Sequence, residues 1–85
     1  MITQEITLKN EEGLHARPAT EIAKKASNYS CEIKLVVNGT EYNAKSVLNL
    51  MSAGIKNNTQ IKVICNGEDE EKALKEVVEI FNNLP

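Results

Sequence analysis

The segment Gly13-Leu14-His15-Ala16-Arg17-Pro18-Ala19 gathers side chains that could handle a phosphate group. It holds the only histidine and the only arginine of the chain, and one of its two prolines. A neutral imidazole is a competent nucleophile toward phosphorus, and a guanidinium can bind a phosphate through two parallel hydrogen bonds. Pro18 predicts that a helix begins at or just before it, because proline is favoured at the first helical position.

A helix that begins at this point creates a site for an anion. Backbone N–H groups without partners and the positive end of the helix dipole meet there. We expect His15 and Arg17 to lie at the mouth of this site, with Gly13 allowing the backbone to turn. Two ordinary interpretations remain open: His15 is simply an exposed loop histidine, and Arg17 pairs with Glu21 one helical turn away.

The strands that must position this segment are indicated by alternation of apolar and polar residues. This pattern predicts strands over residues 2–8, 31–37 and 61–65. Asn38-Gly39 predicts a type I′ hairpin turn, because both central residues of that turn need positive φ. We therefore expect a further short strand over residues 40–44.

Three helices are predicted between and after these strands. The first follows Pro18 and ends at Ser27-Asn28, and the second lies between Ser46 as its N-cap and Gly54 as its stop. The last begins at the acidic run 68–71, and its expected buried stripe consists of Leu74, Val77, Val78 and Phe81. The whole predicts one α+β domain over residues 1–85: an open-faced sandwich of a four-stranded antiparallel sheet with three helices on one face, in the order βαββαβα.

Composition excludes several classes of function. The net charge is −2 and there is no run of Lys or Arg, which argues against a nucleic-acid partner. No apolar run approaches the ~20 residues of a membrane span, and the first residues lack the features of a signal peptide. We therefore expect a cytoplasmic protein in which Cys31 and Cys65 are reduced, buried thiols. One histidine and two distant cysteines make a poor metal site, and with three aromatic residues no large cofactor pocket is expected.

The segment 13–19, together with Lys45-Ser46 and the run 50–55, closely resembles the HPr family, the histidine-containing phosphocarriers of the bacterial phosphoenolpyruvate:sugar phosphotransferase system. The resemblance covers essentially the whole chain. It implies that enzyme I phosphorylates His15 on Nδ1 at the expense of phosphoenolpyruvate. It also implies that Arg17 steadies the phosphoryl group, that Ala16 and Pro18 help to shape its seat, and that enzyme IIA domains of sugar permeases receive it. Such a protein is a covalent carrier rather than an enzyme, and it needs no cofactor.

A second site is expected at the short helix. Ser46 suits an N-cap, and it also matches the serine that an HPr kinase/phosphorylase modifies in Gram-positive relatives, where the family has a role with a catabolite-control transcription factor. A phosphoserine is electrostatically favoured at a helix N-terminus. The helix is apolar around most of its circumference, so we expect Leu50 to point inward and a partner-binding patch to be formed by Val47, Leu48 and Met51.

The chain departs from the family pattern near both sites. Glu12 stands where relatives usually carry Ser, Asn or Thr, and Glu21 lies one turn beyond Arg17, so both carboxylates could repel a phosphohistidine. Asn49 and Ala53 replace a common glycine and a common leucine beside Ser46. A regulatory HPr-like paralogue that acts as a protein-binding module is therefore an alternative, as is a domain that binds an anionic metabolite reversibly. A monomer is expected for a carrier that presents one surface to successive partners.

Overall fold

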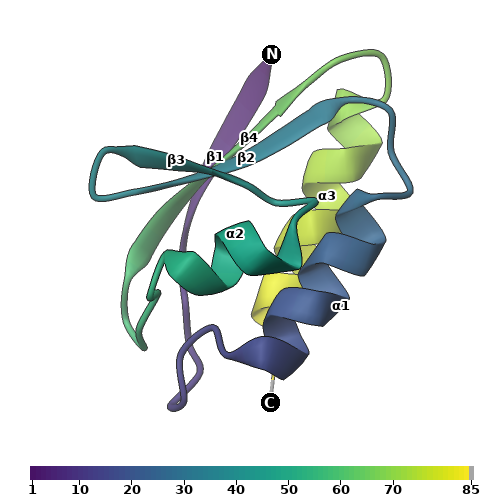
Figure 1. The fold of residues 1–85 in the computed structure, drawn as a ribbon. Coiled ribbons are helices and arrows are strands. Elements are labelled where there is room, and N and C mark those ends of the chain that lie inside the picture. The colour runs from purple at the N-terminus through teal and green to yellow at the C-terminus, as the bar shows by residue number, and fades with distance from the viewer. Residues whose placement is uncertain (85) are drawn as a thin grey trace.

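Four strands form one antiparallel sheet in the order β1-β4-β2-β3. The structure is a computed structural model that describes residues 1–84. Its elements are β1 (Ile2–Thr7), α1 (Ala16–Ala26), β2 (Glu32–Val37), β3 (Thr40–Asn43), α2 (Val47–Ser52), β4 (Gln60–Asn66) and α3 (Glu70–Asn82). The three helices of this range lie together on one face of the sheet (Figure 1). The predicted open-faced sandwich and its βαββαβα order are confirmed.

The central strands follow the predicted alternation of buried and exposed side chains. Ile33, Leu35 and Val37 of β2 are buried, and between them Lys34 and Val36 are only half-buried on the opposite face. The hairpin from β2 to β3 turns at Asn38 and Gly39, which both have positive φ, at 52° and 81°. This is the type I′ geometry that the sequence predicts.

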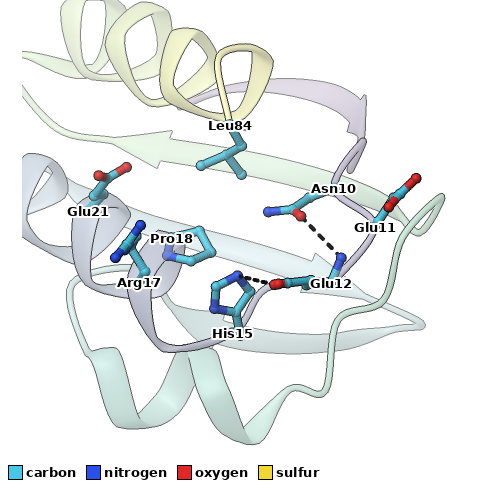
Figure 2. Close-up of a pocket in the computed structure, with 8 residues that line it drawn as sticks. All are labelled: Asn10, Glu11, Glu12, His15, Arg17, Pro18, Glu21 and Leu84. Atoms are coloured by element: carbon cyan, nitrogen blue, oxygen red, sulfur yellow. Dashed lines mark hydrogen bonds and ion pairs between the residues drawn. The ribbon is translucent and has the colours of Figure 1, made fainter.

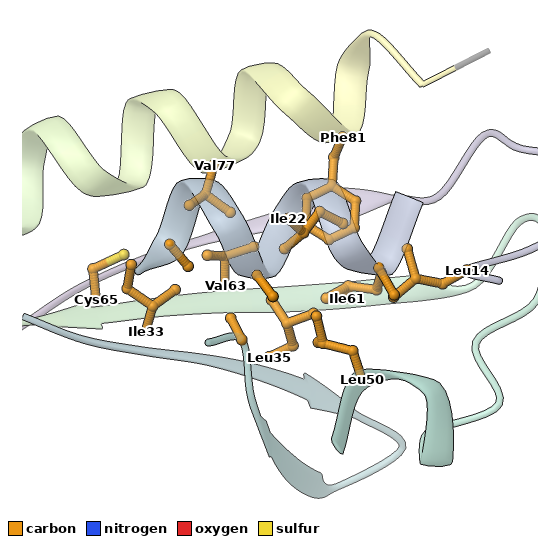
Figure 3. Close-up of a cluster of buried hydrophobic side chains, with 14 of the residues drawn as sticks. Leu14, Ile22, Ile33, Leu35, Leu50, Ile61, Val63, Cys65, Val77 and Phe81 are labelled. Carbon is orange, nitrogen blue, oxygen red and sulfur yellow. The ribbon is translucent and has the colours of Figure 1, made fainter. Parts of the chain in front are cut away.

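The hydrophobic core lies between the sheet and the three helices, and Figure 3 shows side chains from β2, β4 and the three helices meeting there. Within α3 the predicted stripe needs one correction, because Ala73 is fully buried whereas Leu74 is only partly buried at the edge of the core. Ala73, Val77 and Phe81 are spaced four residues apart and form the face of α3 toward the core. A small side chain at position 73 lets the helix approach closely, and Leu74 lies one residue further round.

Helix α1 begins two residues before Pro18. Its first residue is Ala16 and its N-cap is His15, so Pro18 occupies the third helical position rather than the first. Proline is tolerated there for the same physical reason, since the N–H groups of the first turn have no partner within the helix. The consequence is that His15 stands at the helix terminus itself.

The two cysteines are buried and unpaired, as predicted, and their surroundings fasten α3 to the start of β2. The Asp69 carboxylate, at the N-cap of α3, accepts hydrogen bonds from the N–H groups of Ser30 and Cys31 at 2.9 and 3.0 Å. These bonds, led by that from Ser30, hold the pKa of Asp69 below its ordinary value. Burial, followed by the hydrogen bond to Asp69, raises the pKa of the Cys31 thiol to about 12.

Among residues 1–84, no helix has the length and apolar character needed to cross a bilayer.

Candidate functional site

His15 lies at the edge of a surface hollow of about 360 Å³ beside the start of α1 (Figure 2). Its side chain is 43% exposed, so the imidazole is open to a second protein. Glu12 and Asn10 approach from the loop that follows β1, and Leu84 lies next to Asn10 on the side away from His15 (Figure 2). The residues that line the hollow are Asn10, Glu11, Glu12, His15, Arg17, Pro18, Glu21 and Leu84.

The terminus of α1 offers donors to an anion in this hollow. The His15 carbonyl accepts the N–H of Ala19 at 3.0 Å, and this is the first hydrogen bond of the helix. The His15 side chain, in contrast, accepts no bond from a backbone N–H of the first turn. The N–H groups of Ala16 and Arg17 therefore lack a capping side chain at the positive end of the helix. Pro18 is buried beneath them and forms part of the wall.

The Arg17 guanidinium extends into the same hollow and is exposed. Within residues 1–84 it takes part in none of the ion pairs shorter than 4.0 Å, so the alternative in which Glu21 neutralises it is not realised. Figure 2 shows Arg17 and Glu21 on neighbouring turns of α1 without an interaction between them. The guanidinium is thus available to an incoming anionic group.

The backbone that carries His15 is fixed by the segment that follows α2. The N–H of Leu14 donates to the Ile55 carbonyl at 2.9 Å. Gly13 has φ +72°, and a Cβ atom at this position would lie 2.6 Å from the same carbonyl oxygen. A glycine is therefore required by both the conformation and the close approach. This contact joins the His15 loop to residues 54–58 across the base of the site.

A carboxylate faces one nitrogen of the imidazole. Glu12 Oε1 lies 3.9 Å from His15 Nε2, whereas Nδ1 has no hydrogen-bond partner among residues 1–84. The sequence predicts a carboxylate close to His15, and the structure adds which side of the ring it occupies. Glu21 lines the hollow but lies beyond Arg17 and makes no such contact.

Asn10 is a residue of the site that the sequence analysis missed. It is 6% exposed, its own N–H donates to Asn57 Oδ1 at 3.0 Å, and its Oδ1 accepts the N–H of Glu12 at 3.2 Å. An asparagine whose side chain bonds the backbone two residues on is the typical Asx-turn pattern. The spacing of Asn10 and Glu12 before Gly13 could have indicated this turn.

Ser46 is the N-cap of α2, as predicted, and its Oγ accepts the N–H of Asn49 at 3.1 Å. Asn49 adds a bond of its own, because its Oδ1 accepts the N–H of Asn43 at 2.6 Å. Lys45, on the other side of Ser46, donates from Nζ to the Tyr29 carbonyl at 2.7 Å. The start of α2 is thus held by three side chains, and the Ser46 hydroxyl lies half-buried at the surface.

The apolar residues of α2 divide between core and surface. Leu50 is fully buried, as expected, while Leu48 is 83% and Met51 44% exposed. Val47 is half-buried and packs against the core, so it contributes less free surface than the sequence analysis expects. Helix α2 packs against α1, whose N-cap residue is His15. Leu48 and Met51 are therefore exposed on a helix that neighbours the one carrying the candidate site.

The chain is similar to known proteins over most of its length. A family model described as "PTS HPr component phosphorylation site" matches residues 2–83. The phosphocarrier protein HPr of Mycoplasma genitalium is 48% identical over 68 residues, which are 79% of this chain and 77% of that protein. The HPr of Buchnera aphidicola is 34% identical over 84 residues, 99% of both chains.

Solved structures show the same fold. The HPr-C-His structure from Thermoanaerobacter tengcongensis superposes with a TM-score of 0.92 at 36% identity, covering 96% of this chain and 92% of that one. Crh of Bacillus subtilis, a catabolite repression protein described as a swapped-domain dimer, matches with a TM-score of 0.77 at 32% identity over 96% of this chain and 94% of that one. With the family model and the full-length relatives in agreement, the chain belongs to the HPr family of phosphocarrier proteins of the phosphotransferase system.

Proposed function

We propose that His15 Nδ1 accepts a phosphoryl group from phospho-enzyme I, which is charged by phosphoenolpyruvate, and passes it to enzyme IIA domains of sugar permeases. The observation that carries this proposal is the position of His15 as the N-cap of α1, with its side chain exposed and without a capping bond. A phosphoryl group on this residue lies next to the uncapped N–H groups and beside Arg17.

The transfer requires little from the protein besides placement. The lone pair of Nδ1 forms a bond to phosphorus while the bond between phosphorus and the donor breaks. The phosphoryl oxygens then face the Ala16 and Arg17 N–H groups and the guanidinium, which offset their charge, and Pro18 forms the wall of the seat. Donor and acceptor are other proteins, so the chain acts as a carrier in the cytoplasm and not as an enzyme of its own.

The experiment is an intact-mass measurement after incubation with phosphoenolpyruvate and enzyme I. We expect one acid-labile phosphoryl group in the wild-type protein and none in His15→Ala. A phosphoryl group that persists in His15→Ala contradicts the assignment of the site. No addition to the wild type, under conditions where a relative is phosphorylated, contradicts the carrier function.

We infer further that the α2 surface docks these partners. Leu48 and Met51 form an exposed apolar pair, with Val47 at its margin, on the helix that packs against α1. Leu48→Ala should slow phosphorylation by enzyme I while leaving the free energy of unfolding unchanged within about 0.5 kcal/mol. Lys62→Ala, an exposed position of β4, is the matched control and should change neither quantity.

Ser46 is proposed as a regulatory phosphorylation site for an HPr kinase/phosphorylase. A phosphoserine retains an oxygen acceptor at the N-cap of α2, so the helix persists while about two negative charges appear beside the docking surface. That surface then suits a catabolite-control transcription factor and disfavours the sugar-transport partners. Incubation with ATP and the kinase should add one acid-stable phosphoryl group to the wild type and none to Ser46→Ala.

A regulatory role without a relay is the second candidate, and the likeness to Crh favours it. That protein is described as a dimer, whereas we propose a monomer here. Sedimentation of the unmodified chain distinguishes the two states, and the His15→Ala comparison above distinguishes the two functions.

A further inference from the structure

The carboxylate of Glu12 faces the imidazole from one side only. Its Oε1 lies 3.9 Å from Nε2, which is too long for a direct hydrogen bond but short enough for a charge to act on that nitrogen. The Glu12 side chain is 67% exposed, so a small rotation closes the gap. The second nitrogen, Nδ1, has no partner within residues 1–84.

The backbone beneath Glu12 is fixed rather than free. Asn10 Oδ1 accepts the N–H of Glu12 at 3.2 Å, and the carbonyl of Asn10 accepts the N–H of Gly13 at 2.9 Å. Asn10 is itself buried and is held by Asn57 across the site. The side chain of Glu12 therefore starts from a defined position next to His15, as a residue that orients a reactive group must.

We propose that Glu12 is a positioning residue that directs phosphorylation to Nδ1 of His15. This inference rests on the proposed phosphoryl transfer to His15, and it assigns the choice between the two ring nitrogens to one side chain. Two physical effects act in the same direction. A carboxylate that accepts the Nε2 proton leaves the reactive lone pair on Nδ1, and its negative charge repels an anionic phosphoryl donor from the Nε2 side.

The reaction balances with the proton of Nε2 left in place. With phosphoramidate as the donor, the Nδ1 lone pair forms the new bond to phosphorus, and the bond from phosphorus to nitrogen breaks with departure of ammonia. The ring then carries a positive charge, with its Nε2 proton still directed at Glu12. The carboxylate that appears repulsive from the sequence thus offsets the charge that the transfer creates.

Other charged groups surround the hollow and set the scale of the effect. Glu11 and Glu21 also line it, and Arg17 extends toward it from α1. Neither Glu11 nor Glu21 forms an ion pair with His15 within 4.0 Å. Because Glu12 and His15 are both partly exposed, we expect the selection to be modest, about two- to fivefold in the ratio of products.

The test uses phosphoramidate and the full chain, so that no partner protein contributes to the selection. Phosphorus NMR distinguishes the Nδ1 and Nε2 phosphohistidines, and nitrogen NMR of the unreacted protein, in mildly alkaline buffer, gives the two tautomers. In Glu12→Ala we expect both the Nδ1-to-Nε2 product ratio and the fraction of the Nε2–H tautomer to fall. Glu12→Gln keeps an oxygen acceptor without the charge, so its product ratio should lie between those of Glu12→Ala and the wild type. Glu11→Gln, which removes a charge from the same hollow without a contact to His15, should match the wild type.

A product ratio in Glu12→Ala equal to that of the wild type overturns the proposal, because the shape of the site then selects Nδ1 without the carboxylate. An equal change in Glu11→Gln also overturns it, since general charge rather than the Nε2 contact is then responsible. Failure of enzyme I to phosphorylate the wild type contradicts the proposed function alone. The tautomer and the phosphoramidate product ratio still test Glu12 in that case.

Discussion

Substitution of Gly13 by alanine tests whether the His15 loop depends on its close contact with the segment after α2. Gly13 has φ +72°, and an added Cβ would lie 2.6 Å from the Ile55 carbonyl oxygen and 3.3 Å from Lys56 Cα. These are backbone atoms, so no flexible side chain can move aside. The Ile55 carbonyl also accepts the N–H of Leu14 at 2.9 Å, and relief of the clash must disturb this bond.

The expected loss of stability has two parts. A non-glycine residue in the left-handed region costs about 1–2 kcal/mol. Loss of the Leu14 hydrogen bond adds about 0.5–1.5 kcal/mol. We therefore expect Gly13→Ala to lower the free energy of unfolding by about 1.5–3.5 kcal/mol, a large share of the stability of a domain of this size.

Gly54→Ala is the matched control. Gly54 has φ +61°, close to that of Gly13, but a Cβ atom there has no heavy atom within 4 Å. The free energy of unfolding of Gly54→Ala should fall only by the conformational part, about 1–2 kcal/mol. Urea unfolding of the two variants, followed by circular dichroism, measures the difference directly.

Equal losses in the two variants refute this reasoning. Gly13 would then be needed only for its backbone angles, and the contact with Ile55 would place no constraint on the His15 loop. A larger loss in Gly13→Ala, together with slower phosphorylation by enzyme I, supports the view that this contact positions the reactive residue.

Three further predictions follow from the core and the charged groups. In urea unfolding, Leu50→Ala should lower the free energy of unfolding by about 2–5 kcal/mol because Leu50 is fully buried. Leu48→Ala should change it by nearly zero because Leu48 is exposed. Similar losses in the two variants would contradict the division of α2 into a buried and an exposed side. The pKa of Asp69 is lower in the folded state than its unfolded value of 3.8, so its contribution to stability is complete above that pH and is lost as the pH falls below it. Between pH 7 and pH 3, the free energy of unfolding should fall less in Asp69→Asn than in the wild type. Equal decreases in the two proteins would argue against Asp69 as the cause. Cys31 and Cys65 are buried and burial raises the pKa of both thiols, so a thiol reagent should label neither within minutes in the native state and both in urea.

The sheet and the place of His15 at the start of a helix were predictable because their signals are local. Alternation along β2 and β4 depends on neighbouring residues, and the Asn38-Gly39 turn is specified by two adjacent positions. Pro18 indicated the first turn of α1 but not its first residue, because each early N–H in a helix lacks a partner and proline fits at several of them. The buried stripe predicted for α3 was wrong at one position, where Ala73 rather than Leu74 is fully buried. The two residues are adjacent, and only the packing distance decides which of them is buried.

What the sequence could not show is how distant segments meet at the site. Asn10 bonds Asn57, and Leu14 bonds Ile55, across separations of more than 40 residues that no local pattern encodes. Asp69, predicted for the start of the last helix, likewise bonds the chain before β2, at separations of 39 and 38 residues. Which nitrogen of the imidazole Glu12 faces is also a matter of three-dimensional arrangement, and it emerged only from the structure.

These long-range bonds also bear on the proposal that one site serves several partners. The bonds that hold the His15 loop come from backbone groups and from Asn10 and Asn57, and none of them uses the imidazole or the guanidinium of Arg17. The backbone is thus fixed while the side chains of His15 and Arg17 remain exposed. The proposed transfer needs this combination, because a rigid backbone would present Nδ1 in the same place to donor and acceptor. A loop that ordered only on binding would pay the entropy of ordering at each encounter and would weaken every transfer.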